Sequence, residues 1–219
     1  MPLPLLVIGN KNYSSWSLRP WLLLRHHGIA FAEHRLLLDT PGFAREIETW
    51  SPSRTVPALH HDGIVVWDSL AICEYANETF LAGDGWPADA TGRAVARAVS
   101  AEMHSGFRAL RTALPMNCRR RTEGTRLDAA VRADVARIQA IWRDCRARFG
   151  GDGRFLFGDF SIADAMFAPV AMRFVGYGVA LDDDARDYVR TLSALPALQD
   201  WLRDAEAETE TLAATDAVP

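Results

Sequence analysis

The chain has 219 residues, of which 49% are hydrophobic and 24% charged, a balance typical of a globular protein that excludes a disordered one. A net charge of −4 argues against a general nucleic-acid-binding role. No apolar run approaches the roughly 18 to 20 residues needed to span a bilayer, so we expect no membrane association.

The cysteines and histidines give no sign of a disulfide framework or a metal site. Cys73, Cys118 and Cys145 are too few and too scattered for either. The pairs 26–27 and 60–61 are both His-His, but they lack a third ligand at metal spacing, so we expect no metal. The lack of a disulfide framework fits a reducing compartment, and we expect a cytoplasmic protein.

The first fifty residues alternate strand and helix signals. Short apolar runs and helical spacing predict, in order, a strand at 5–8, a helix at 18–27, a strand at 31–38 and a short helix at 43–50. Pro20 suits the first turn of the first helix. This stretch therefore predicts a β-α-β unit.

A hairpin and a helix follow. The loop over 51–57 contains two prolines, and the Asp62-Gly63 pair is a strong two-residue turn signal between strands at 58–61 and 64–67. Ser69 is a good N-cap for a helix that runs to about residue 81. The unit is therefore β-β-α.

The remainder of the chain has helical periodicity and no internal repeats. Glycines and a proline mark 82–90 as a linker, which divides the chain into domains at 1–81 and 91–219. The last dozen residues are expected to be frayed. Helices are expected at about 91–115, 128–149, 161–175, 184–192 and 196–207.

Taken together, these features resemble the glutathione transferase family. The element order, the Val56-Pro57 pair before the third strand, the acid-serine pair Asp68-Ser69 and the all-helical second half all match it. The run Ser-Ser-Trp-Ser-Leu-Arg at 14–19 resembles the Ser-Ser-Cys-Ser-x-Arg signature of the zeta class, with Trp16 in place of Cys. The resemblance implies an α/β thioredoxin-like N-terminal domain followed by an all-α C-terminal domain.

A second motif of the family lies in the helical half. Residues 158–164, Gly-Asp-Phe-Ser-Ile-Ala-Asp, resemble its helix-capping motif. Ser161 and Asp164 have the spacing of a capping box, which satisfies backbone N–H groups at a helix N-terminus. We interpret both residues as structural and not catalytic.

The resemblance places catalysis at the start of the first helix, where Ser14 and Ser17 stand in place of a Cys-x-x-Cys pair. Dithiol exchange is therefore disfavoured, and a thiol brought by the ligand would be activated instead. Lowering a thiol pKa from about 8.5 to about 6.5 requires about 2.7 kcal/mol, which one hydroxyl donor and one helix N-terminus can supply. Ser14, five residues before Arg19, is the favoured donor and Ser15 the second choice. Alternatively, both serines only cap the helix.

The resemblance also implies a set of glutathione-binding residues. Val56 and a cis-Pro57 would pair with the cysteinyl unit, Ser69 would bind the γ-glutamyl carboxylate, and Asp68 would bind the ammonium group, with possible help from a neighbouring subunit. Arg54 is a candidate for the glycyl carboxylate. The alternatives are a trans-Pro loop, a simple helix cap and an exposed arginine.

The electrophile pocket is expected on the first helix of the second domain. His104, Phe107, Arg108 and Arg111 follow i, i+3, i+4, i+7 spacing and would share one face. Facing the cleft, they would offer aromatic and cationic contacts to an acidic or conjugated substrate. Facing elsewhere, Phe107 would be core and the others solvated. Trp16 would also reshape the pocket near the sulfur.

The resulting hypothesis is a homodimeric, cytoplasmic glutathione transferase that adds the thiolate of its co-substrate glutathione to a small electrophile. One alternative is a glutathione-dependent cis-trans isomerase like maleylacetoacetate isomerase, which the serine motif favours and the bulky Trp16 disfavours. Another is a glutathione-binding protein without catalytic activity. No nucleic-acid or membrane partner is expected.

Overall fold

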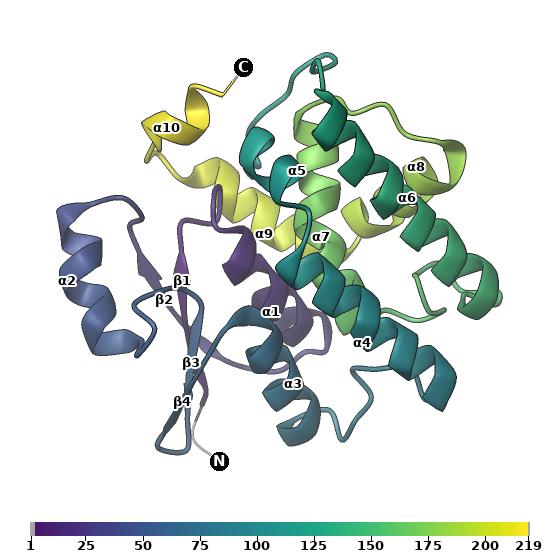
Figure 1. The fold of residues 1–219 in the computed structure, drawn as a ribbon. Helices are drawn as coiled ribbons and strands as arrows, with labels where there is room; N and C mark the ends of the chain where they lie inside the picture. Colours follow the sequence, from purple (N-terminus) through teal and green to yellow (C-terminus); the bar gives the residue numbers. More distant parts are fainter. Residues whose placement is uncertain (1–2, 219) are drawn as a thin grey trace.

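The computed structural model describes residues 3–218 and contains one mixed four-stranded sheet in the order β2-β1-β3-β4 (Figure 1). Strands β1 (Leu5–Gly9) and β2 (Ala32–Leu36) are parallel. Strand β3 (Ala58–His61) pairs antiparallel with β1 and, through the expected hairpin, with β4 (Ile64–Trp67). The α/β half thus has the expected order of elements.

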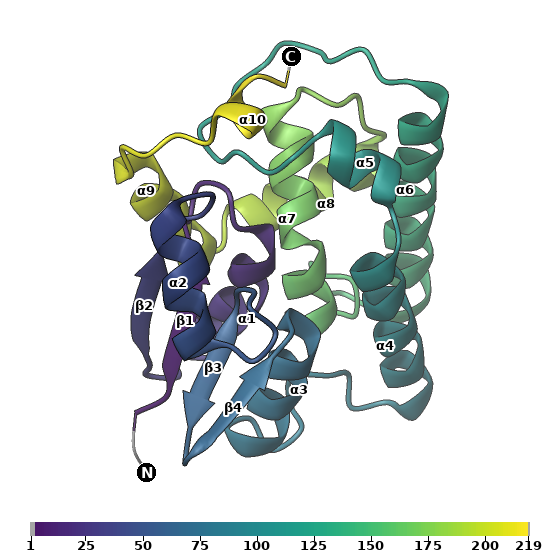
Figure 2. The same cartoon turned by 60° about the vertical axis from the view of Figure 1, so that its left-hand side comes forward.

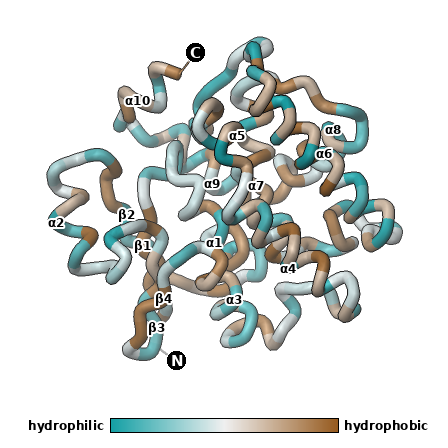
Figure 3. Tube along the Cα trace, viewed as in Figure 1, coloured by the Kyte–Doolittle hydropathy of each residue, from teal (hydrophilic) through white to brown (hydrophobic). Residues whose placement is uncertain are grey.

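Helices cover both faces of the sheet. Helix α2 (Pro41–Trp50) lies on one face, and α1 (Ser15–His26) and α3 (Ser69–Thr79) lie on the other (Figure 2). Successive strand residues point to opposite faces. Accordingly, Val7 of β1 belongs to a small core under α2, whereas its neighbours pack into the main core with α1. The apolar stretches of β1 and of the β3–β4 hairpin stand out in Figure 3.

The second half is helical, as expected. Its centre is α7, which is buried along almost its whole length and packs against α1 and α4. A helix that is apolar on all sides is stable only in such an interior position. The helices of this half are α4 (Ala90–Ser105), α5 (Arg108–Ala113), α6 (Ala129–Phe149), α7 (Ile162–Gly176), α8 (Asp183–Ser193), α9 (Pro196–Ala207) and α10 (Ala213–Asp216).

The expected capping box at the start of α7 is confirmed. The Asp164 carboxylate is fully buried and accepts four hydrogen bonds, from the N–H and hydroxyl of Ser161, the N–H of Leu156 and the hydroxyl of Tyr188. Burial raises its pKa to about 6. This carboxylate therefore joins α7, α8 and the loop before α7.

Two expected helices differ in the structure. Helix α1 begins at Ser15 and not at residue 18, so Pro20 lies inside it and not in its first turn. The helix expected at 91–115 is two helices, because the chain leaves helical geometry at Gly106 and adopts left-handed geometry at Phe107, with φ 54°. A Cβ at Gly106 would lie 2.6 Å from the Glu102 carbonyl oxygen, so a larger residue would not fit this break.

The C-terminal segment is also more ordered than expected. Its Asp216 carboxylate accepts hydrogen bonds from the Tyr13 hydroxyl at 2.9 Å and from the Asn117 amide at 2.8 Å. The buried Glu208 carboxylate accepts the N–H groups of Lys11 and Asn12 at 2.7 and 3.0 Å. The segment thus holds the β1–α1 loop that precedes Ser14.

Within residues 3–218, the structure contains no helix of the length and apolar character that crossing a membrane requires.

Candidate functional site

The start of α1 brings the two candidate serines to the carboxyl end of β1. Ser14 is the N-cap residue, buried, and its hydroxyl donates to the Ser17 hydroxyl at 2.7 Å. The Ser17 oxygen in turn accepts the N–H of Gly9 at 3.1 Å. A helix N-terminus carries a partial positive charge that favours an anion. Ser14 therefore caps α1, as the alternative interpretation held, and also lies where an anion would be stabilised.

Ser15 has a different partner. Its hydroxyl oxygen accepts a hydrogen bond from the Arg173 guanidinium of α7 at 3.1 Å. The same guanidinium donates to the carbonyls of Leu114 and Pro169, and Arg173 is buried. The serine motif thus reaches directly into the helical half of the molecule.

The N-terminus of α3 lies beside that of α1. Arg19 of α1 is buried and donates to the Ser69 hydroxyl at 3.3 Å. Ser69 is buried as well. The N-cap of α3 is Asp68, whereas the sequence predicted Ser69, because the Asp68 carboxylate accepts the N–H groups of Leu70 and Ala71. The expected serine and acid at the start of this helix therefore lie next to the serine motif.

Three guanidinium groups converge here, and the Asp68 carboxylate balances only part of their charge. Among the described residues, Arg19, Arg111 and Arg173 form no salt bridge, and the Nε atoms of Arg19 and Arg111 are buried without a hydrogen-bond partner. Burial, followed by the nearby Arg173, lowers the pKa of Arg19 to about 9. Burial, followed by Arg111, lowers that of Arg173 to about 10. Arg19 and Arg173 therefore stay cationic at neutral pH, and the three guanidinium groups together favour an anionic ligand.

Trp16 is half-buried and lies against two of these guanidinium groups. The Arg19 guanidinium lies 4.2 Å from the ring centroid and that of Arg111 lies 5.4 Å away. His104 meets the ring edge-on, with centroids 5.2 Å apart. Cations are attracted to the face of an indole, so the ring helps to hold the arginines together.

His104 links the helical half to the start of α3. Its Nε2 lies 3.0 Å from an oxygen of the Asp68 carboxylate. The His104 carbonyl lies 3.4 Å from the Arg111 guanidinium, which joins the end of α4 to α5. Burial lowers the pKa of His104, and Asp68 opposes that effect.

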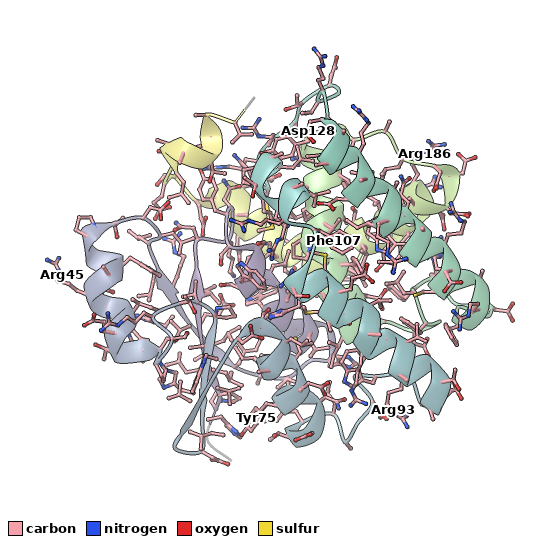
Figure 4. All side chains as sticks on the ribbon, viewed as in Figure 1. Arg45, Tyr75, Arg93, Phe107, Asp128 and Arg186 are labelled. Carbon is pink, nitrogen blue, oxygen red and sulfur yellow. The ribbon has the colours of Figure 1, made fainter. Side chains whose placement is uncertain are left out.

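The structure therefore divides the four residues expected on one helix face. His104 and Arg111 both reach Trp16, but Phe107 is buried in the core at the α4–α5 junction (Figure 4), and Arg108 is exposed. The prediction of one shared face is wrong because the helix breaks between Ser105 and Arg108. The interpretation of Phe107 as a core residue is confirmed.

The loop before β3 carries the remaining candidates. The Val56-Pro57 bond is cis, as expected. Arg54 lies on the surface of this loop, with its side chain 73% exposed and 3.3 Å from the Glu48 carboxylate. Nothing in its surroundings distinguishes it from an ordinary exposed arginine.

The cysteines are poor nucleophiles, which argues against thiol exchange. Cys73, Cys118 and Cys145 are all free and buried, and burial raises the pKa of each thiol. Across residues 3–218, no three His, Cys, Asp or Glu side chains are grouped so that they could hold a metal ion.

The sequence interpretation missed two members of this site. Arg19 appeared only as part of the serine motif, and Arg173 was not singled out. A lone arginine within the apolar segment of α7 is a usable signal, because a buried charge needs a partner or a function. The sequence could not show that Arg19 and Arg173 lie close to each other and to Arg111 in the folded chain.

Comparison with known proteins gives consistent results. Residues 13–79 match the family model for the glutathione S-transferase N-terminal domain, and residues 128–204 match the model for the C-terminal domain. Maleylacetoacetate isomerases of rat and mouse are each 34% identical to this chain over 108 residues, which is 49% of this chain and 50% of theirs. The matched part is thus about half the length of these curated relatives.

Solved structures share the fold. A glutathione transferase homologue from Burkholderia, solved with bound glutathione, superposes with a TM-score of 0.73 at 24% identity and covers 94% of this chain and 100% of that one. A glutathione S-transferase from the Antarctic clam Laternula elliptica gives 0.71 at 19% identity and covers 100% of both chains.

Proposed function

The chain belongs to the glutathione S-transferase family, and from this premise we propose that it binds glutathione, stabilises the thiolate and adds the sulfur to a small electrophile. Residues 1–81 would form the glutathione-binding domain, and residues 91–219 would supply most of the electrophile pocket. The observation that carries the proposal is the group of serines at the start of α1, adjacent to three cations without a carboxylate partner among the described residues.

The first step is thiol activation. The Ser14 hydroxyl would turn from Ser17 and donate to the sulfur, since a hydrogen bond to an anion is about twice as strong as one between neutral groups. The thiol proton leaves for solvent, and the positive N-terminus of α1 and the guanidinium of Arg173 stabilise the negative charge that remains on the sulfur. Ser15, held by Arg173, would be the second donor to the sulfur.

Glutathione itself would be held by the loop before β3 and by α3. The Val56 backbone would pair with the cysteinyl unit, Ser69 would donate to the γ-glutamyl carboxylate, and Asp68 would accept from its ammonium group. Arg54 is kept as a candidate for the glycyl carboxylate from the resemblance alone.

The electrophile would carry a carboxylate. From the helical half, Arg173 contacts Ser15 and Arg111 contacts Trp16, and neither arginine forms a salt bridge in the described part of the chain. A buried cation without an anionic partner, such as Arg173, is costly, and an anionic substrate would reduce that cost. Trp16, whose ring contacts Arg19 and Arg111, would favour a small or planar electrophile.

Arg111 and Arg108 provide a matched test of this assignment. In Arg111→Ala, we expect the KM for a carboxylate-bearing electrophile such as maleylacetone to rise about tenfold, the effect of losing one charge-assisted hydrogen bond. The KM for a neutral electrophile such as chlorodinitrobenzene should change little. Steady-state kinetics with both substrates measures this difference.

The control for Arg111→Ala is Arg108→Ala, which removes an exposed arginine from the same helix. It should leave both KM values unchanged. Equal losses with the two electrophiles in Arg111→Ala would contradict a carboxylate contact.

Isomerisation is a second candidate activity, favoured by the similarity to the maleylacetoacetate isomerases. In this reaction, glutathione would add to the double bond of the substrate, and the adduct would rotate about the resulting single bond. Glutathione would then leave and so be regenerated. A panel containing maleylacetone and conjugatable electrophiles tests the proposal. Binding of glutathione without turnover of any of them would leave only a binding protein.

A cytoplasmic homodimer is the proposed assembly. Three free cysteines are compatible with a reducing compartment. Strand β4 is an edge strand, and its Ile64 and Trp67 are 48% and 46% exposed. Exposed apolar side chains on a sheet edge are common at interfaces between subunits.

If β4 forms the dimer interface, a charge introduced at Trp67 should strongly weaken the dimer. Trp67→Glu should weaken the dimer by about 2 kcal/mol or more, because tryptophans that an interface buries are frequent hot spots. Light scattering after gel filtration should show monomer at micromolar concentration. Leu37→Glu, at a residue that follows the opposite edge strand and is 40% exposed, should remain dimeric. A wild-type monomer, or a dimeric Trp67→Glu, would contradict this interface.

A further inference from the structure

Asp68 is the residue of this chain expected to bind the ammonium group of glutathione, and it already has a partner from the helical half. The Nε2 atom of His104 lies 3.0 Å from Asp68 Oδ2. The other carboxylate oxygen, Oδ1, accepts the N–H groups of Leu70 and Ala71 at the start of α3. Oδ2 is therefore the oxygen left for a ligand, and His104 occupies it.

The hydrogen-bonding of the ring indicates its protonation state. Within residues 3–218, Nδ1 of His104 is buried and has no hydrogen-bond partner. A neutral ring with its proton on Nε2 donates to Asp68 and leaves only an unpaired acceptor at Nδ1. A protonated ring would bury an N–H without an acceptor, which is more costly.

We propose that His104 is a positioning residue that orients Asp68 for the γ-glutamyl ammonium when neutral and competes with that ammonium when protonated. The inference rests on the proposed binding of glutathione. It adds a residue that touches neither the sulfur nor the electrophile in that proposal.

The charges around the ring determine the direction of the pH effect. Asp68 faces it from the start of α3, Arg19 from α1 and Arg111 from α5, while Trp16 packs against its edge. Burial lowers the pKa of His104, and both arginines lower it further, whereas Asp68 raises it. The ring is therefore neutral at pH 7 and becomes charged below its ordinary pKa of about 6.5.

A bound ammonium adds a further positive charge beside the ring. Ligand binding and protonation of His104 are then mutually unfavourable, by linkage. Affinity for an ammonium-bearing ligand should be full near pH 8 and should fall as the pH drops through the range in which His104 becomes charged.

S-methylglutathione is the appropriate probe, because it has no thiol to titrate. Calorimetry between about pH 5 and about pH 8 should show roughly tenfold weaker binding to the wild type at the acid end, the size of one lost charge-assisted hydrogen bond. In His104→Gln, the side-chain amide can still donate to Asp68 but cannot become charged. Its affinity near pH 8 should stay within about threefold of the wild type, and its acid-side loss should disappear.

Two controls separate this effect from others. His26→Gln changes a histidine at the opposite end of α1 and should retain the wild-type pH profile. The glutaryl analogue of S-methylglutathione, which lacks the amine, should lose no affinity at acid pH in the wild type. Circular dichroism shows whether His104→Gln is folded, and His104→Asn provides a second uncharged amide if it is not.

The outcomes are distinct. Binding that weakens equally at acid pH in the wild type and His104→Gln would overturn the role of His104 and leave the proposed function intact. The same acid-side loss with the amine-free analogue would also overturn it. Failure to bind S-methylglutathione or glutathione at any pH would overturn the proposed function, and this inference with it.

Discussion

Replacing Ser14 with alanine is expected to raise the pKa of bound glutathione by about one to two units and to slow conjugation at pH 7 about tenfold. The size follows from losing one hydrogen bond to a charged group, worth about 1.5–3 kcal/mol, at about 1.36 kcal/mol per pKa unit. Because the thiol is then protonated at neutral pH, the defect should be large below pH 7 and should shrink above about pH 9, where solvent alone removes the proton. Ultraviolet absorbance of the thiolate, titrated in the complex, measures the shift.

Three further measurements separate the loss of the Ser14 hydroxyl from other effects of Ser14→Ala. Ser14→Thr retains a hydroxyl and should restore most of the thiolate at pH 7. Ser14 also caps α1, so the alanine variant should lose about 0.5–2 kcal/mol of stability, which a melting curve detects separately. An unchanged thiol pKa in Ser14→Ala, with the pKa raised in Ser15→Ala, would transfer the role to Ser15.

The Asp164→Asn substitution should lower the free energy of unfolding by about 3 kcal/mol. Each carboxylate oxygen accepts two hydrogen bonds, one of them from a backbone N–H, of Leu156 on one side and Ser161 on the other. Either orientation of the asparagine amide therefore places its NH₂ against a buried N–H. An unsatisfied buried group costs about 1–3 kcal/mol, and the remaining bonds lose their charge.

Thermal unfolding should show this loss as a Tm lower by roughly 6–12 °C, at about 2–4 °C per kcal/mol for a chain of this size. Asp159→Asn is a matched control within the same motif, because Asp159 is exposed. It should melt within about 1–2 °C of the wild type. A normal Tm for Asp164→Asn would contradict the structural role of this carboxylate.

The local elements were predictable because their signals are local. The hairpin at Asp62-Gly63, the helix beginning at Ser69 and the capping box at the start of α7 all depend on residues within a few positions of one another. The break between α4 and α5 was not predicted, because the periodicity continues through Gly106 while the backbone does not. As a result, Phe107 and Arg108 were assigned to a pocket face that they do not share.

In the candidate site, too, the features that depend on local sequence were predicted and those that depend on tertiary packing were not. The serine motif and the Asp68-Ser69 pair could be recognised along the chain, since each is one short segment at a helix N-terminus. Arg173 could not be assigned in this way, although it contacts Ser15 directly. Sequence separation carries no information about such a contact, which depends on how α7 packs against α1.

The sequence by itself thus predicted the α/β half, the helical half, the helix caps and the serine hydroxyls expected near the glutathione sulfur. The cluster of Arg19, Arg111 and Arg173 and the pairing of His104 with Asp68 arise only when α1, α3, α4, α5 and α7 pack together. The physical reason is that a helix cap or a turn is stabilised by residues close in sequence. The charge cluster depends instead on burial and on repulsion between side chains from separate helices, and both exist only after the helices pack.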